Sequence, residues 1–138
     1  MRLWHQKLIP YLPRQQLLGQ HRECCALRGK GWSRKHATVD YVFTHDPSFL
    51  VAYHYCVMAE MKTRGYHPDP VWKNANWRGK ELGMDMSEEW AAQDCVDELF
   101  SWVLLLKEIV YPEHNEEYLE ECLDNLKSKG IEIEIKGE

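Results

Sequence analysis

Two stretches of this 138-residue chain begin with a helix start signal and end at a glycine. The first has Pro13, a residue suited to the first helical turn, and continues to about Arg28, with Gly29 as its stop. The second has the N-cap residue Asp46 directly before a proline, and apolar residues then recur at helical spacing until Gly65. This pattern predicts two helices in the first half of the chain.

The second half of the chain repeats these helix signals. Asp85 and Glu88 have the spacing of a capping box, and an apolar stripe then continues until Pro112. Asn115 is a good N-cap for a last helix, which would end at Gly130. Both segments carry most of their acidic residues on the outer face, so they are predicted to be amphipathic helices that cover the core.

Three other segments do not fit this simple pattern. Residues 36–43 alternate like a strand but also have helical spacing, and we expect a helix because no partner strand is evident. Residues 66–83 lack periodicity and predict a long loop, a kind of segment that often carries function. The isoleucines of residues 131–135 alternate with charges, which is typical of a strand. The expected fold is all-α: a compact single-domain helical bundle over residues 1–138, with long loops and a possible short C-terminal strand.

Composition narrows the class of protein. The longest apolar run is five residues, far below the roughly 20 that a membrane span needs. The N-terminus has no apolar segment of signal-peptide length, so a cytoplasmic protein with no membrane partner is expected. The five cysteines include no C-x-x-C pair and the seven histidines are scattered singly, so we expect no disulfide framework, no metal and no cofactor.

Charge is distributed very unevenly along the chain. The net charge is −5, yet residues 1–80 hold 13 Lys and Arg against 5 Asp and Glu, whereas residues 81–138 hold 4 against 17. Because salt screens charges over about 8 Å, a basic half can attract an anion whatever the total charge. The basic half is therefore a candidate nucleic-acid interface, although an ordinary solvated surface has the same composition.

One stretch of the basic half, LLGQHRECCALRGKGWSRKH, concentrates reactive and charged residues. An Arg-Glu pair and two adjacent cysteines precede a Gly-Lys-Gly turn and a run of cations. Arg34 and Lys35 in that run are candidate phosphate contacts, and so is Arg78 in the loop sequence NWRGK. Each of these cations also fits an ordinary charged surface, so the chemistry of this stretch stays open at this point.

Four short segments carry a resemblance to a known family: PRQQLLGQHRE, RKHATVDYVF, MKTRGY and NWRGK. Together they resemble the pyrimidine-dimer DNA glycosylases, also called the phage-type endonuclease V family, and a weak match extends through YPEHNEEYLEECLDNL. Members are compact all-helical enzymes that flip a nucleotide near a cyclobutane pyrimidine dimer, cleave its glycosidic bond and nick the strand at the abasic site, without a metal. The resemblance implies a DNA glycosylase with AP-lyase activity, whose partner is damaged double-stranded DNA.

The resemblance also implies roles for single residues. Glu23 would be the catalytic carboxylate, and Arg22, Gln15 and Arg2 would contact substrate or phosphate. The family's nucleophile is the α-amine at the chain start, expected here on Met1 because a residue as bulky as arginine normally blocks removal of the methionine. An α-amine has a pKa of about 7.7 to 8.0, so a sizeable fraction is unprotonated and nucleophilic at neutral pH.

This sequence departs from the family pattern in three places. Retention of Met1 places one extra residue before Glu23. The cation that the family carries shortly after its glutamate falls on Ala26, so Arg28 is the candidate substitute. The family's aromatic C-terminal tail, which contacts DNA, is replaced by an acidic helix and the sequence IEIEIKGE. Lyase chemistry stays plausible, whereas the recognised lesion, a pyrimidine dimer or an abasic site, is open.

Two other classes of function are compatible with the sequence. The first is a non-enzymatic helical module whose basic face binds nucleic acid or an acidic protein, and which needs no free N-terminus. The second is a thiol enzyme that uses Cys24 or Cys25, with His21 or His36 as the base that forms the thiolate. Blocking the N-terminus distinguishes the first class from a lyase, and sensitivity to iodoacetamide identifies the second.

Overall fold

The computed structural model of the chain describes residues 2–32, 39–90 and 108–135 and the single positions 100 and 103. The described residues form α-helices, 3-10 helices (η) and loops, and no strand is present among them. In chain order the elements are η1 (Gln6–Tyr11), α1 (Arg14–Arg28), η2 (Asp40–Thr44), α2 (Pro47–Thr63), η3 (Pro70–Lys73), η4 (Glu88–Trp90) and α4 (Glu116–Ser128). The prediction of an all-α fold is confirmed.

α1 has the bounds that its proline and glycine predict. It begins directly after Pro13, and the backbone N–H of Gly29 closes it by donating to the carbonyls of Cys25 and Ala26. The chain then turns so tightly that the N–H of Gly31 also reaches the carbonyl oxygen of Ala26, at 2.9 Å. A Cβ atom at position 31 would lie 2.7 Å from that oxygen, so the turn requires glycine.

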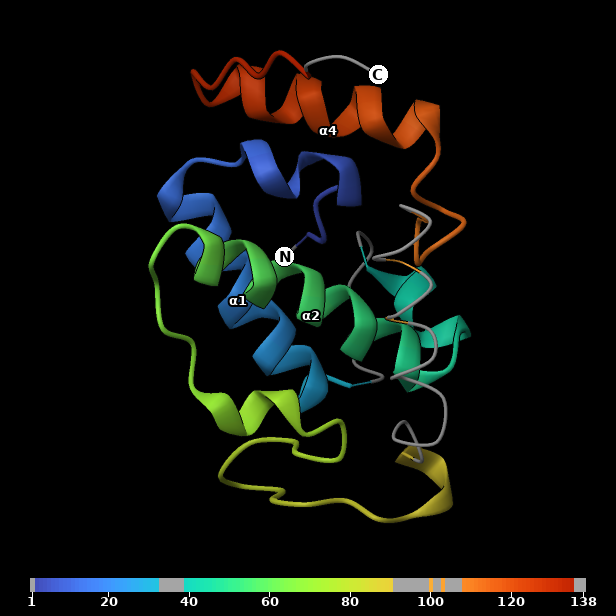
Figure 1. Cartoon of the computed structure of the whole chain (residues 1–138). Coiled ribbons are helices and arrows are strands. Elements are labelled where there is room, and N and C mark those ends of the chain that lie inside the picture. The colour runs from blue at the N-terminus through green and yellow to red at the C-terminus, as the bar shows by residue number, and fades with distance from the viewer. Residues whose placement is uncertain (1, 33–38, 91–99, 101–102, 104–107, 136–138) are drawn as a thin grey trace.

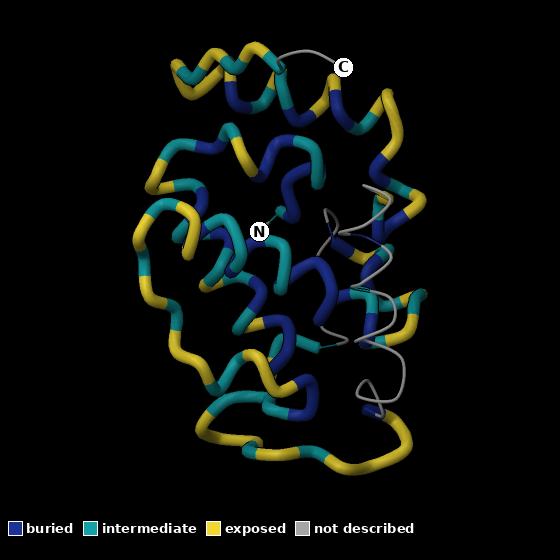
Figure 2. The backbone as a smooth tube through the Cα atoms, in the orientation of Figure 1, coloured by how far each residue is buried: buried dark blue, intermediate teal, exposed yellow. Residues whose placement is uncertain are grey.

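α2 is the central helix of the described structure. Asp46 caps it as predicted, because its side chain accepts from the N–H of Ser48, and Gly65 follows its end with a φ of +87°. Figure 2 shows its long buried stretch. The buried side chains point to several sides of the helix: Ser48, Leu50, Val51, Ala52, Tyr53, His54, Val57, Met58 and Met61. Burial on several sides means that α2 packs against more than one neighbouring element.

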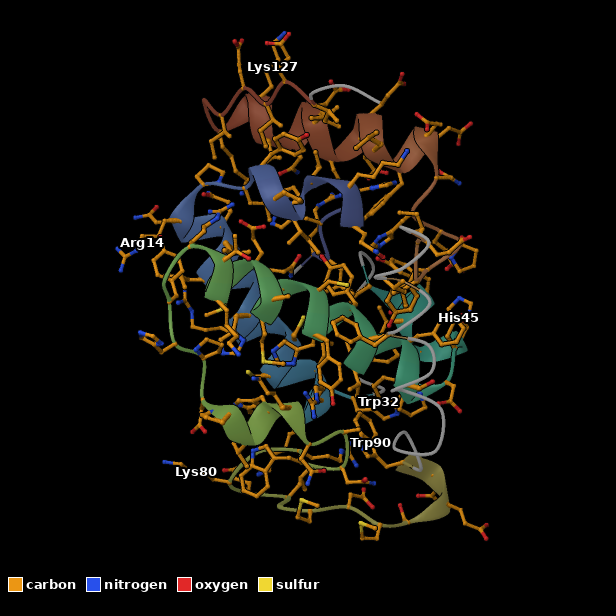
Figure 3. All side chains as sticks on the ribbon, in the orientation of Figure 1. Arg14, Trp32, His45, Lys80, Trp90 and Lys127 are labelled. Carbon is orange, nitrogen blue, oxygen red and sulfur yellow. The ribbon has the colours of Figure 1, made fainter. Side chains whose placement is uncertain are left out.

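α4 lies at one end of the molecule, next to η1, and the loop of residues 66–90 lies at the other end, with α1 and α2 between them (Figure 1). Asn115 caps α4 as predicted, since its side chain accepts from the N–H of Tyr118. The inner face of α4 is buried, whereas Lys127 points away from the molecule (Figure 3). The last helix is therefore amphipathic, as its sequence predicts.

The possible C-terminal strand is not formed in the part of the tail that the structure describes. Residues 131–135 follow α4 without strand pairing. Their three isoleucines are partly buried and pack against the core. The alternation of isoleucine and charge therefore indicates which side of the tail packs against the core. No strand forms there, because a single strand without a partner gains no ladder of hydrogen bonds.

Two other segments also differ in detail from the sequence pattern. The predicted helix over 36–43 is present as the 3-10 helix η2, although residues 36–38 lie outside the described part. Asp85 accepts from the N–H of Ser87, one residue earlier than a capping box requires. Most of the helix expected after it lies outside the described residues. No helix in the described part of the chain is long and apolar enough to cross a membrane.

The loop of residues 66–90 is held against α1 by aromatic and charged side chains. Trp32 meets Trp90 edge to face, with ring centroids 5.1 Å apart, and it meets Phe43 in the same way at 5.2 Å (Figure 3). The loop contains η3 and one isolated antiparallel bridge, between Trp77 and Met84. The predicted loop is therefore an ordered element that covers the C-terminal end of α1.

Candidate active site and nucleic-acid interface

The N-terminal segment, residues 2–4, is fixed to the helices through its backbone. The buried side chain of Gln20 donates from Nε2 to the carbonyl of Arg2 at 2.9 Å and accepts at Oε1 from the N–H of Trp4 at 2.6 Å. The hydroxyl of Tyr53 donates to the carbonyl of Trp4 at 2.6 Å and lies 2.9 Å from Oε1 of Gln20. Helices α1 and α2 thus hold the start of the described chain in a defined position.

Glu23 lies one helical turn after Gln20, on the same side of α1. Its side chain is half-buried, and its Oε2 atom is inaccessible to solvent. Met1 lies outside the described residues, so the contact between its amine and Glu23 stays a prediction.

The solvent face of α1 carries two of the predicted DNA contacts. Gln15, Gly19, Arg22 and Ala26 follow one another at helical spacing, and we call these four residues the α1 stripe. Gln15 and Arg22 are exposed. A Cβ atom at position 19 would lie 3.8 Å from an Nη atom of Arg22, so the guanidinium lies beside the glycine. Glu23 therefore follows an exposed cation in the helix, and the exposed amide of Gln15 lies about two turns earlier.

A hollow of about 570 Å³ adjoins the end of the α1 stripe. Cys25 and Ala26 line it from α1, and Trp72, Arg78 and Leu82 line it from the loop. The stripe therefore leads from Gln15 to a concavity that has an aromatic ring in its wall.

Arg2 lies against α4. Its guanidinium is 3.6 Å from Glu121, and it lies over the rings of Trp4 and Tyr118 at 5.8 and 5.9 Å. The side chain is 17% exposed, against 63% for Glu121. Arg2 is engaged with α4 in this structure, and its expected contact with a phosphate stays a prediction.

Arg28 does not fit its expected role as a phosphate contact. It is fully buried, and its guanidinium donates to the carbonyls of Trp72, Asn74 and Trp77 at 2.8, 2.7 and 3.0 Å, and to Nδ1 of His54 at 3.0 Å. Burial lowers its pKa to about 10, so it still carries its charge at neutral pH. Arg28 fastens the loop to α1 and α2, and it cannot reach DNA without leaving these partners.

Arg78 is corrected for a related reason: it is only partly buried, but its donors are engaged within the protein. It donates to the carbonyls of Arg28 and Gly29 at 2.7 and 3.3 Å, pairs with Asp85 at 2.8 Å and lies 4.1 Å above the ring of Trp90. These contacts occupy its donors with the last carbonyls of α1, which makes it a helix cap. The two other predicted phosphate contacts, Arg34 and Lys35, lie outside the described residues.

His21, Cys25 and His54 form a cluster between α1 and α2 whose donor atoms lie within 4.8 Å of one another, close enough for a metal ion. Arg28 can only donate, so Nδ1 of His54 accepts and the proton of the neutral ring is on Nε2. That N–H then points to Nδ1 of His21, 2.8 Å away. Ligation of a metal by His54 would need a free lone pair at Nε2, so the contacts favour a chain of hydrogen bonds over a metal site.

The same cluster does not support a thiol enzyme. Burial raises the pKa of Cys25 to about 11 and keeps the pKa of Cys24 well above its usual range, so neither thiolate forms readily at neutral pH. Burial, followed by the charge of Arg28, keeps the pKa of His54 well below its ordinary value. The spacing of His21 and Cys25 by four residues places them on one face of a helix, in agreement with the sequence, whereas the part of His54 in the cluster was not predicted.

The described structure is that of a small helical protein in which the half-buried carboxylate of Glu23 lies one turn after the residue that anchors the N-terminal segment, and next to the exposed cation Arg22. A family model described as pyrimidine dimer DNA glycosylase matches residues 1–74, more than half of the chain. The chain therefore belongs to the pyrimidine dimer DNA glycosylase family, which is a family of DNA-repair enzymes. No curated protein and no solved structure matches it.

The family match contains part of the site and leaves part outside it. Residues 1–74 include α1, α2 and thus Gln20, Glu23 and Tyr53. The helix α4, which contacts Arg2, lies beyond the match. The roles of Gln20 and Tyr53 were not predicted. The sequence does contain a signal for Gln20, because it is a polar residue at an inward position of α1, three residues before the candidate catalytic carboxylate.

Proposed function

We propose that this chain is a DNA glycosylase with AP-lyase activity, which acts on pyrimidine-dimer-type or abasic lesions in double-stranded DNA through the α-amine of Met1. The proposal requires that the mature chain starts at Met1. One observation carries it: Gln20 fixes the backbone of Arg2 and Trp4 on α1, one turn before the half-buried Glu23. Fixing the residues that follow a terminal amine would help to orient that amine as a nucleophile, which lowers the entropic cost of the reaction.

The proposed chemistry proceeds in two steps. The unprotonated α-amine attacks C1′ of the sugar, and the bond from C1′ to the damaged base breaks. The bound amine loses a proton, the bond from C1′ to the ring oxygen O4′ opens, and O4′ takes up a proton, which leaves a protonated imine between enzyme and sugar. Removal of a proton from C2′ then expels the 3′ phosphate by β-elimination. Glu23 stabilises the cationic imine and transfers protons in both steps. At an abasic site the amine adds to the aldehyde, water leaves, and the same imine forms.

The α1 stripe is proposed as the DNA contact closest to this chemistry. Arg22 would pair with a phosphate, and Gln15 would contact the substrate from the same face. The hollow beside Ala26 offers space for an extruded nucleotide, whose base could stack on Trp72. Arg2, Arg34 and Lys35 stay candidate phosphate contacts, whereas Arg28 and Arg78 are no longer assigned to the interface.

Borohydride trapping tests the proposal directly. We expect incubation of the protein with an abasic-site duplex and borohydride to give a covalent adduct, and peptide mapping to place the adduct on Met1. Protein whose N-terminus is acetylated should bind the duplex but give no adduct. An adduct on a lysine, or one that survives acetylation, would exclude the α-amine mechanism. Salt-dependent binding of DNA without any adduct would favour the non-enzymatic helical module.

A further inference from the structure

We propose that Tyr118 of α4 is a positioning residue for the N-terminal amine, and the inference rests on the function proposed above. The hydroxyl of Tyr118 donates to the carbonyl of Leu3 at 2.5 Å. Leu3 lies between the two residues that Gln20 holds, and its own side chain is fully buried. A helix beyond the family match therefore supplies the third attachment of the N-terminal segment.

The three attachments act on successive peptide groups. From α1, Gln20 binds the carbonyl of Arg2 and the N–H of Trp4; from α2, Tyr53 binds the carbonyl of Trp4. Tyr118 binds the carbonyl between them, and its ring lies under the guanidinium of Arg2. Rotation of the peptide group between Leu3 and Trp4 would swing the preceding residues away from α1, and Tyr118 opposes that rotation.

Tyr118 is itself held by a directed chain of hydrogen bonds. The N–H of Gln6 donates to Nδ1 of His114 at 3.1 Å, which places the proton of the neutral ring on Nε2. That N–H donates to the hydroxyl of Tyr41 at 2.7 Å, and Tyr41 in turn hydrogen-bonds to Tyr118. Every member therefore has one fixed role, and the proton of Tyr118 is directed to the carbonyl of Leu3.

The protonation states of His114 and Tyr118 agree with this direction of hydrogen-bond donation. Burial, followed by the charge of neighbouring His5, lowers the pKa of His114 to about 3, so the ring is neutral at neutral pH. Burial raises the pKa of Tyr118 to about 12, so its hydroxyl keeps the proton that it donates. The chain can therefore hold its direction throughout the pH range in which an α-amine is reactive.

The test compares Tyr118→Phe with the matched control Tyr66→Phe. Tyr118→Phe removes only the hydroxyl and keeps the ring under Arg2. Tyr66 is also half-buried and also lies beside an arginine, Arg14, at 5.7 Å, but it follows α2 and does not contact the N-terminal segment. Single-turnover trapping on an abasic duplex with protein in excess measures formation of the imine. We expect Tyr118→Phe to slow it about fivefold, the effect of losing the hydrogen bond to the carbonyl of Leu3, and Tyr66→Phe to leave it unchanged.

Two further readouts separate positioning from general stability. The dissociation constant for the duplex should be the same in both variants, because Tyr118 is not proposed to contact DNA. Hydrogen exchange at the amides of Leu3 and Trp4 should become faster in Tyr118→Phe, whereas exchange in α2 should not. An unchanged trapping rate with unchanged exchange would overturn the inference, and so would an equal loss of trapping in the two variants.

The outcomes also distinguish this inference from the proposed function. If the wild-type protein forms no adduct at all, the proposed function fails, and the role of Tyr118 in catalysis fails with it. If the wild type forms the Met1 adduct and Tyr118→Phe forms it at the same rate, only the positioning role is overturned. Faster exchange at Leu3 together with an undiminished trapping rate would show that Tyr118 holds the segment without aiding the reaction.

Discussion

Arg22 and Arg28 lie on the same helix, less than two turns apart, yet their surroundings are opposite. Arg22 is exposed and lies beside Gly19, whereas Arg28 is fully buried and donates to three carbonyls and a histidine. The middle and the C-terminal end of α1 therefore use the same residue type for different purposes. The middle of α1 exposes Arg22 to solvent, and the C-terminal end fastens the loop through Arg28.

The difference follows from what each guanidinium finds around it. A buried cation is tolerated only where acceptors replace its water, and the loop supplies three carbonyls to Arg28. Arg22 is exposed, so its guanidinium is hydrated and can exchange that water for a phosphate. A count of cations in the basic half therefore overestimates the number that are accessible to DNA.

Glu23→Gln should abolish strand cleavage, with a loss of about 10²- to 10⁴-fold in rate. The amide cannot transfer the protons or stabilise the cationic imine, but it keeps the size of the side chain. Cleavage of an abasic duplex under single-turnover conditions measures the effect, and duplex binding should stay within a few fold. A rate of cleavage near that of the wild type would show that Glu23 is an ordinary helix residue without a catalytic role.

Arg28→Met should lower the free energy of unfolding by about 3 kcal/mol or more, because the three partly buried carbonyls and His54 lose their donor. Denaturant unfolding gives the value. Arg22→Met is the matched control and should change stability by less than about 0.5 kcal/mol. Equal effects of the two substitutions would contradict the division of α1 into a solvent-facing middle and a fastening C-terminal end.

The buried end of α1 should also make stability depend on pH through His54. Its pKa is lowered in the folded state, so the unfolded chain binds the proton more readily. The stabilising contribution is therefore complete above about pH 6.5, the unfolded value, and is lost as the pH falls toward the folded pKa. The size is about 1.4 kcal/mol for each unit by which the pKa is lowered.

His54→Asn isolates this contribution, because asparagine offers an acceptor to Arg28 and does not titrate. Unfolding of wild type and variant should be measured between pH 7.5 and 5. We expect the stability difference between them to shrink at the lower pH, as only the wild type loses the contribution of His54. Parallel curves would show that the histidine does not titrate differently in the two states. His5 and His114 affect both proteins alike and cancel, whereas His21 hydrogen-bonds to His54, so the difference reports the pair.

Arg22→Met should have the smallest effect, which concerns DNA binding alone. Loss of one phosphate contact reduces the slope of log K against log salt by about 0.9. Duplex affinity measured at several salt concentrations between about 50 and 200 mM gives the slope. An unchanged slope would remove Arg22 from the interface. A test of Arg28 by the same assay is not informative, because that substitution also affects folding.

The helices of the described structure were predictable because their signals are local. Pro13 with Gly29, Asp46 with Gly65 and Asn115 satisfy or end a helix through groups that are only a few residues away. The family was predictable as well, since its short motifs are contiguous in the chain. The C-terminal strand was not, because a strand depends on a partner that periodicity cannot supply.

The candidate site also combines predictable and unpredictable features. That Glu23, Gln15 and Arg22 share one helix follows from the sequence, because helical spacing fixes which side chains are neighbours. The burial of Arg28 and the attachment of residues 2–4 by Gln20 and Tyr118 are apparent only in the tertiary structure. Those roles depend on carbonyls and hydroxyls from segments up to 115 residues away along the chain, and burial is decided where such segments meet.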